Sequence, residues 1–300
     1  MNRISFYDQI AKNRRSSFFL SVIVFSFLVA LIYVISEIFI PELSLLFLIV
    51  SMIMVFLYTY STYNYGDSIV LAATKAQPID ENDPKYVHLV NVVEGLSIAA
   101  GVPKPSIHLI ESDEINAFAT GKDPQHASIA VTTGLLKNLR RDELEGVIGH
   151  ELSHIRNYDI RFATLVAVMV GLVAILSNMF LRSMWYAPRG GKRERRGDVG
   201  LLVLVGVLLA ILSPIIVRLV QFAISRRREF LADASSVELT RYPPGLANAL
   251  DKIMRINRGD MKVSEAVSHL FFVDPTKSPL DSLYATHPSI EERIRILRAM

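Results

Sequence analysis

The chain contains no cysteine. This absence excludes a disulfide framework and any metal site built from thiolates, and it fits a reducing compartment. Glycine-rich loops of the kinds that hold phosphates are also missing, so any step driven by a nucleotide would need a partner protein. What the sequence has in excess is apolar residues, which make up 51% of it and give a mean hydropathy of +0.34. A chain this apolar is unusual for a soluble domain.

The apolar residues are concentrated in four runs that carry no charge. Each run has about 20 residues, enough to cross a hydrocarbon core of about 30 Å as a helix. The runs form two pairs, and they predict two transmembrane helical hairpins. Their bounds are Phe18–Ile35 and Leu43–Tyr63 for the first pair, and Phe162–Leu181 and Val199–Val217 for the second.

Basic residues indicate how the hairpins are oriented. Those from Arg3 to Arg15 precede the first run, which places the N-terminus in the cytoplasm by the positive-inside rule. Two crossings return the chain, so residues 64–160 are expected to be cytoplasmic. For the second pair we favour a spanning hairpin. Full crossing would put the basic loop 182–198 outside, against that rule, so a shallow insertion is the alternative. The juxtamembrane Lys and Arg residues predict contact with anionic lipid and not with nucleic acid.

The most informative motif is His150-Glu151-Leu152-Ser153-His154. In a helix the two histidines would share one face and could bind the same metal ion, with Glu151 beside the first of them. The surrounding sequence predicts such a helix over 142–155, because its apolar residues recur at helical spacing. These apolar residues are Leu144, Val147, Ile148, Leu152 and Ile155.

The same helix carries two further signals. Asp142 and Glu145 are spaced to form a capping box at its start. Gly146 and Gly149 each cost a helix about 1 kcal/mol relative to alanine, which indicates that another element packs closely there.

A catalytic zinc takes three protein ligands and leaves a position for water, so a third ligand is needed. Glu229 is the candidate, and Asp233, one helical turn later, could accept the spare ring N–H of a ligand histidine. The spacing alone equally allows a solvated helix end with surface ion pairs. If Glu229 and His150 share one metal, the chain between them must cross the membrane an even number of times.

The motif and the distal Glu-x-x-x-Asp together resemble the pattern of gluzincin zinc peptidases. In detail the chain is similar to the HtpX-type membrane proteases, a family related to the CAAX prenyl endopeptidases. The matching segments lie in the expected order along nearly the whole chain, with no departure at a metal or base position. They are 116–121, 131–136, 149–159, 228–233 and 286–289.

The resemblance implies a membrane-bound zinc endopeptidase that cleaves misfolded or damaged membrane proteins, or other unfolded polypeptides. It would be a multi-pass protein of the plasma (inner) membrane, acting at the cytoplasmic face in quality control and stress response. The implied fold is mainly α with a small β-sheet, in which transmembrane hairpins join a gluzincin-like peptidase domain. We expect an N-terminal hairpin over 1–65, a domain with the HExxH helix over 66–160, a second hairpin over 161–224, and the remaining part of the domain over 225–300.

The resemblance also assigns roles to the metal site. One Zn²⁺ per chain would be held by His150, His154 and Glu229. Glu151 would accept the proton of the attacking water and return it to the leaving amine. Asp233 is expected beside a ligand ring, and Asn157 and Asp159 are expected either to end the helix or to lie around the ligands.

Two further roles concern the substrate. His287 is a candidate second donor to the oxyanion, and a loop histidine packed on Pro288 is the alternative. Asn116, Ala117 and Phe118 would belong to an edge strand that holds extended substrate by β-augmentation, and an ordinary strand is the alternative there.

The rest of the chain before the motif predicts mixed α and β structure. Apolar periodicity predicts a helix over 86–100 and strands over 106–110, 116–120 and 128–133. The remaining histidines show no ligand spacing and are expected to be surface or core residues. They are His88, His108, His126 and His269.

Two other functions share the metal site. One is a non-catalytic membrane scaffold whose zinc is structural, but such a site has no use for the carboxylate of Glu151 and usually closes its fourth position. The other is a protease that processes prenylated proteins, which would carry further apolar segments that are not found here.

Overall fold

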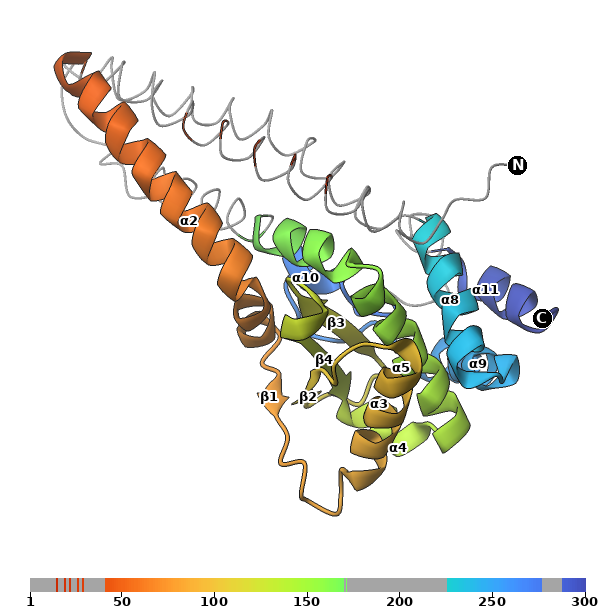
Figure 1. The fold of residues 1–300 in the computed structure, drawn as a ribbon. Helices are drawn as coiled ribbons and strands as arrows, with labels where there is room; N and C mark the ends of the chain where they lie inside the picture. The colour runs from red at the N-terminus through yellow and green to blue at the C-terminus, as the bar shows by residue number, and fades with distance from the viewer. Residues whose placement is uncertain are drawn as a thin grey trace, which may run out of the picture.

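The computed structural model describes residues 41–169, 171, 226–276 and 288–300, together with helical positions 15, 19, 22, 26 and 29. Within these residues the fold is mainly helical, with one small mixed sheet (Figure 1). In chain order the elements are η1 (Pro41–Leu43), α2 (Ser44–Ala73), β1 (Gln77–Pro78), α3 (Val87–Ala100), β2 (Ser106–Ile110), β3 (Ala117–Gly121), η2 (Pro124–His126), β4 (Ala127–Thr132), α4 (Thr133–Asn138), α5 (Arg141–Arg156), α8 (Arg226–Thr240), α9 (Pro243–Ile256), α10 (Glu265–Ser268) and α11 (Ile290–Leu297).

The sheet has the order β1-β2-β4-β3. β2 and β4 are parallel, and β3 and β1 add to them in antiparallel fashion at the two edges. Every residue of β4 and β3 is buried, because both faces of the sheet are covered. Ala117 and Ala119 face the larger core with α3, α5 and α9, whereas Phe118 faces a second core with the end of α2. The predicted helix at 86–100 and all three predicted strands are confirmed to within one residue.

Helix α5 carries the HExxH motif through the larger core. Its two glycines let neighbouring helices approach, as the sequence indicated. A Cβ at Gly146 would lie 2.7 Å from the backbone nitrogen of Leu246 in α9, and one at Gly149 would lie 2.9 Å from Oγ of Ser236 in α8. Because these contacts are with backbone or with a buried hydroxyl, a larger residue would push α8 and α9 away from the motif.

The start of α5 differs from the prediction. The helix begins at Arg141, and the carboxylate that closes its first turn belongs to Glu143, which accepts a 2.7 Å hydrogen bond from the backbone N–H of Arg140. The capping box predicted for Asp142 and Glu145 is therefore wrong by two residues. Glu143 is the better partner because it is buried and also binds Nζ of Lys252 at 2.7 Å.

Helix α2 extends well away from the sheet, whereas α8, α9 and α11 gather on the other side of the domain (Figure 1). Among the described residues it is the one helix long and apolar enough to cross a membrane, over Leu45–Ala73 with a mean hydropathy of 2.0. It runs past the predicted boundary at residue 65, and Val70 and Leu71 are buried in the second core. The long apolar helix α2 thus continues into the peptidase domain.

The third apolar run begins inside the domain. Residues 159–169 are helical, and the side chains of Phe162, Leu165 and Val166 are buried. Oγ1 of Thr164 lies 2.8 Å from Oγ1 of Thr120 in β3, which ties this helix to the sheet. The remainder of this run, the fourth run, the basic loop 182–198 and the boundary at 224 lie outside the described residues, as does nearly all of the first run.

Replacing Gly146 with alanine tests the close approach of α9 to α5. We expect Gly146→Ala to lower the free energy of unfolding by about 1–3 kcal/mol, because α9 must shift to admit the methyl group. The matched control is Gly95→Ala in α3, where nothing lies within 4 Å of the added Cβ. That change should stabilise the protein by about 0.5–1 kcal/mol through helix propensity. Equal stabilisation by both, measured by denaturant unfolding, would contradict the packing.

Candidate active site

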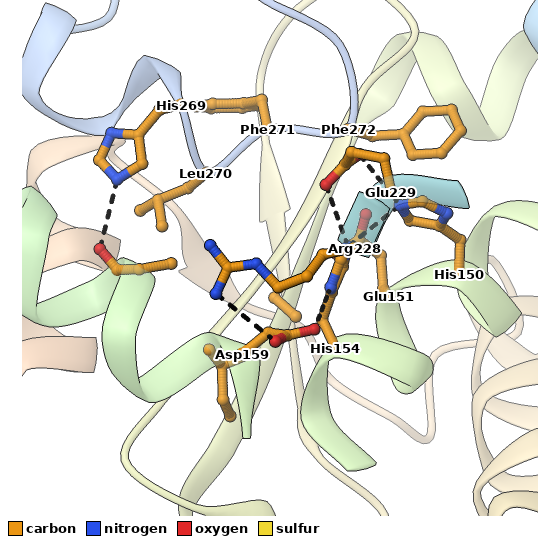
Figure 2. Close-up of a pocket in the computed structure, with 13 residues that line it drawn as sticks. His150, Glu151, His154, Asp159, Arg228, Glu229, His269, Leu270, Phe271 and Phe272 are labelled. Atoms are coloured by element: carbon orange, nitrogen blue, oxygen red, sulfur yellow. Dashed lines mark hydrogen bonds and ion pairs between the residues drawn. The ribbon is translucent and has the colours of Figure 1, made fainter. Parts of the chain in front are cut away.

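The candidate metal ligands come together from α5 and α8. Nε2 of His150 and Nε2 of His154 lie 3.1 Å apart. One carboxylate oxygen of Glu229 lies 3.7 Å from Nε2 of His150, and the other lies 3.7 Å from Nε2 of His154. The three candidate ligand atoms are within 4.8 Å of one another, so the structure brings together the residues that the sequence singled out (Figure 2).

These distances fit a tetrahedral cation. Two nitrogens bound at about 2.0–2.1 Å to one tetrahedral zinc lie about 3.3 Å apart, close to the separation of the two Nε2 atoms. The outer nitrogen of each ring faces a carboxylate: Nδ1 of His150 lies 2.9 Å from Asp233, and Nδ1 of His154 lies 3.0 Å from Asp159. Each Nδ1 therefore carries the ring proton. The lone pairs of the two Nε2 atoms then point at one spot beside the carboxylate of Glu229.

Asp233 and Asp159 thus lie where each can hold a ligand ring. The sequence predicted this contact for Asp233, whereas Asp159 was expected either at the end of the helix or around the ligands. Fixing the tautomer and the ring orientation is what such outer carboxylates do at metal sites. Asn157 lies at the end of α5 as its C-cap, where its Nδ2 is 3.3 Å from Oγ of Ser153. Its placement corresponds to a helix-terminal residue.

Arg293, on α11, is a site residue that the sequence analysis missed. Its guanidinium binds both carboxylate oxygens of Asp233, at 2.6 and 2.8 Å, and it is buried with 1% exposure. The signal was present: Arg293 lies within the apolar stripe formed by Ile290, Ile294 and Leu297, where a charged residue needs a buried partner.

Arg228 stands in a similar relation to the second ligand. Its Nη1 lies 3.8 Å from Asp159, whose other oxygen holds His154. Each ligand histidine therefore contacts an aspartate, and that aspartate contacts an arginine from a distant part of the chain. The Arg228 side chain also lines the cleft at the metal site (Figure 2).

Electrostatics at the rings differ between the two ligands. Burial lowers the pKa of His150 to about 4, and the charge of Arg293 acts in the same direction. Burial also lowers the pKa of His154, but the carboxylates of Asp159, Glu229 and Glu151 outweigh it and raise that pKa to about 9. The surroundings of His150 therefore favour its neutral ring, whereas those of His154 favour positive charge.

Two carboxylates beside the ligands have opposite shifts. Burial would raise the pKa of Asp233, but Arg293 and the hydrogen bond from His150 hold it at about 2. Burial raises the pKa of Glu151 to about 7, with Glu229 adding to the effect. Asp233 is thus always a carboxylate near neutral pH, whereas Glu151 is poised to gain and lose a proton.

The cleft around Glu151 is formed by β3, α5 and the segment after α10. Ala119 lies on the β3 side, and His269, Leu270, Phe271 and Phe272 lie on the other. The Phe272 ring packs on His150 with the ring centroids 4.8 Å apart. His269, which was expected on the surface or in the core, lines this cleft, and its Nε2 donates to the carbonyl of Ala163 at 3.3 Å.

The three residues proposed for the substrate strand do lie at β3. Asn116 and Ala117 are buried next to the segment after α10, at the edge of the sheet. Phe118 is a core residue: it has 0% exposure, and its ring packs on Phe271 with the centroids 4.9 Å apart. His287 lies outside the described residues.

Removing the carboxylate behind His150 tests how the ring is oriented. We expect Asp233→Asn to weaken zinc binding about 10–100-fold, because the neutral amide no longer fixes the Nδ1 proton. Zinc affinity would be measured by competition with a chelator on the purified full chain. The control is Asp251→Asn, which removes an ion pair to Arg255 on the surface of α9 and should leave zinc affinity unchanged. Identical affinities for both variants would show that Asp233 does not orient the ligand.

Comparison with known proteins agrees with this geometry. Residues 85–300 match the family described as peptidase family M48. A protein of Dictyoglomus turgidum named Protease HtpX homolog is 43% identical over 301 residues, covering 100% of this chain and 96% of its own. A Protease HtpX homolog of Caldanaerobacter subterraneus is 46% identical over 250 residues, covering 83% of each chain.

The fold is also similar to a solved one. The crystal structure of S. mikatae Ste24p superposes with a TM-score of 0.50 at 20% identity, covering 88% of this chain. This chain spans 61% of the length of that protein, and at this identity the likeness concerns the fold alone. The family match over residues 85–300 and the two relatives, which are matched over 96% and 83% of their own lengths, show that the chain belongs to peptidase family M48 and is a metalloprotease.

Proposed function

We propose that this metalloprotease is a zinc endopeptidase that cleaves unfolded or damaged membrane proteins at the cytoplasmic face of the plasma (inner) membrane. The observation that carries the zinc assignment is the pair of Nε2 atoms 3.1 Å apart, each on a ring whose Nδ1 faces a carboxylate. Nitrogen and carboxylate ligands in this number are the donor set of a hydrolytic zinc site. One ion per chain would be held by His150, His154 and Glu229.

When bound, zinc supplies a Lewis acid that polarises the scissile carbonyl and makes a water more acidic. Glu151 does the proton transfer: it takes the proton of the attacking water and returns it to the leaving amine. Its pKa of about 7 suits both steps. Asp233 and Asp159 keep the two rings in one orientation while this happens, and Arg293 keeps Asp233 charged. His287 remains our candidate for a second donor to the oxyanion.

The substrate backbone would add to the edge of β3. Asn116 would bind the substrate backbone through its side-chain amide, and Ala117 would bind it through the backbone N–H and carbonyl that point away from β4. Pairing with a strand edge requires an extended chain, which folded proteins rarely offer. This supports unfolded polypeptides as the substrate class.

Membrane proteins are favoured as substrates by the position of α2. This helix is long and apolar enough to cross a bilayer, and its last turns pack in the same core as Phe118 of β3. The site is therefore attached to the end of a helix that could cross the bilayer. We propose a multi-pass arrangement with the basic juxtamembrane segments on anionic lipid.

Replacing Glu151 with glutamine tests the proton transfer. We expect Glu151→Gln to keep one equivalent of zinc and to lower the rate of peptide cleavage by about 10²–10⁴-fold or more, because the amide cannot accept a proton. Cleavage of an unfolded reporter would be followed together with the zinc content. Unchanged cleavage would refute the mechanism, and a loss of zinc would instead place Glu151 among the ligands.

The lack of cysteine makes a direct test of topology possible. A single cysteine at Gly190 should react with a membrane-impermeant thiol reagent added outside intact cells, because a spanning second hairpin puts loop 182–198 outside. The matched control is Asp113→Cys, at a side chain with 96% exposure in the peptidase domain, which should react only after the membrane is opened. Protection of residue 190 from outside would establish the shallow insertion, and external labelling of residue 113 would refute the cytoplasmic site.

A further inference from the structure

The edge of β3 has two residues whose backbone groups turn away from the sheet. Residues of an antiparallel strand alternate between bonding the neighbouring strand and facing outward. The carbonyl of Asn116 accepts from the N–H of Thr132, the last residue of β4. The backbone groups of the next residue, Ala117, therefore point away from β4, and those of Ala119 do so again. These are the groups that a substrate strand would use.

The chain already fills part of this edge with its own residues. We define the edge segment as Leu270–Val273, which follows α10. The N–H of Phe272 donates to the carbonyl of Ala117 at 2.8 Å. The side-chain amide of Asn116 donates to the carbonyl of Val273 at 2.8 Å and accepts from its N–H at 3.2 Å. An amide side chain offers the donor and acceptor of a peptide group, so the edge segment binds as an added strand would.

Aromatic side chains hold the edge segment in place. The ring of Phe271 packs on Phe118 with centroids 4.9 Å apart, and the ring of Phe272 packs on the metal ligand His150 at 4.8 Å. The guanidinium of Arg293 lies 4.6 Å from the centre of the Phe272 ring. Phe271 and Phe272 are 1% and 2% exposed. The edge segment therefore reaches from the substrate edge to the metal site (Figure 2).

We propose that the edge segment Leu270–Val273 occupies the place of a substrate strand, so that cleavage requires its displacement by an extended polypeptide with two adjacent large apolar residues. This rests on the proposed function and adds the regulation and the selectivity of the same site. The backbone of a substrate can make the same three hydrogen bonds to Asn116 and Ala117 that the edge segment makes. The burial of two phenylalanine rings is replaced only if the substrate brings apolar side chains of its own.

The need to displace the edge segment makes the enzyme selective for sequences with adjacent large apolar residues. Adjacent large apolar residues lie inside folded proteins or within bilayers, and they become available in an extended form after unfolding. A hydrophilic peptide would leave the edge segment bound and the site closed. The chain itself supplies the reference ligand, because its own sequence here is Leu-Phe-Phe-Val.

The first test follows the edge segment by hydrogen exchange. The probe is an unfolded peptide that contains Phe-Phe, and its cleavage by the zinc-loaded wild type first establishes the peptidase activity independently. The full-length Glu151→Gln protein is then mixed with this peptide at ten times the KM of the wild type. We expect the amides of Phe272 and Val273 to exchange at least tenfold faster, while those of Ile129 and Val131 in β4 stay protected.

Persisting protection of Phe272 and Val273 under these conditions would overturn the proposal, because substrate would then bind with the edge segment in place. The peptide with Ser-Ser in place of Phe-Phe should leave both amides protected and should be cleaved at least tenfold less efficiently. Equal cleavage of the two peptides would overturn the selectivity.

The second test weakens the edge segment without touching the hydrogen bonds. Phe271→Leu removes the ring contact with Phe118 and should lower the KM for the Phe-Phe peptide several-fold, with little change in kcat, because the competing strand is held less firmly. The matched control is Ile253→Val, a similar loss of packing at a fully buried site in α9, which should leave the KM unchanged. An unchanged or raised KM in Phe271→Leu would count against displacement.

Discussion

The site depends on two hydrogen bonds made by the outer nitrogens of the ligand rings. Because Nδ1 of His150 faces Asp233 and Nδ1 of His154 faces Asp159, both Nε2 lone pairs are directed at one point. Two lone pairs and a carboxylate that converge in a buried place repel one another unless a cation lies between them. The surrounding helices serve this arrangement: the small residues of α5 admit α8 with its glutamate, and α11 supplies the arginine that keeps Asp233 ionised.

The sequence was sufficient for most features that depend on short spacing. The HExxH helix, the bounds of the helix and strands that precede it, and the spacing of Glu229 and Asp233 all rest on residues within a few positions of one another. The glycines of α5 correctly indicated close packing, although the sequence could not say which helices were involved. The capping prediction failed because Asp142, Glu143 and Glu145 all lie near the helix start, and burial beside Lys252 selected Glu143.

Apart from the metal ligands and Asp233, features that join distant parts of the chain could not be predicted. Arg293 pairs with a residue 60 positions away, and Asn116 binds the backbone of a residue 157 positions away. A charged residue in an apolar stripe signals that a buried partner exists but does not identify it. The edge segment gave no signal at all, since Leu-Phe-Phe-Val reads as ordinary core. Its contacts explain why the enzyme can carry a complete hydrolytic site and still restrict access to it.

The most direct test of the account is X-ray absorption at the zinc edge of the purified chain, compared with its Glu229→Gln variant. We expect one zinc per chain in the wild type, with two imidazoles and oxygen ligands at about 2.0–2.1 Å, and loss of stoichiometric zinc in the variant. A shell with three imidazoles, or zinc that stays unchanged when Glu229 is replaced, would contradict it.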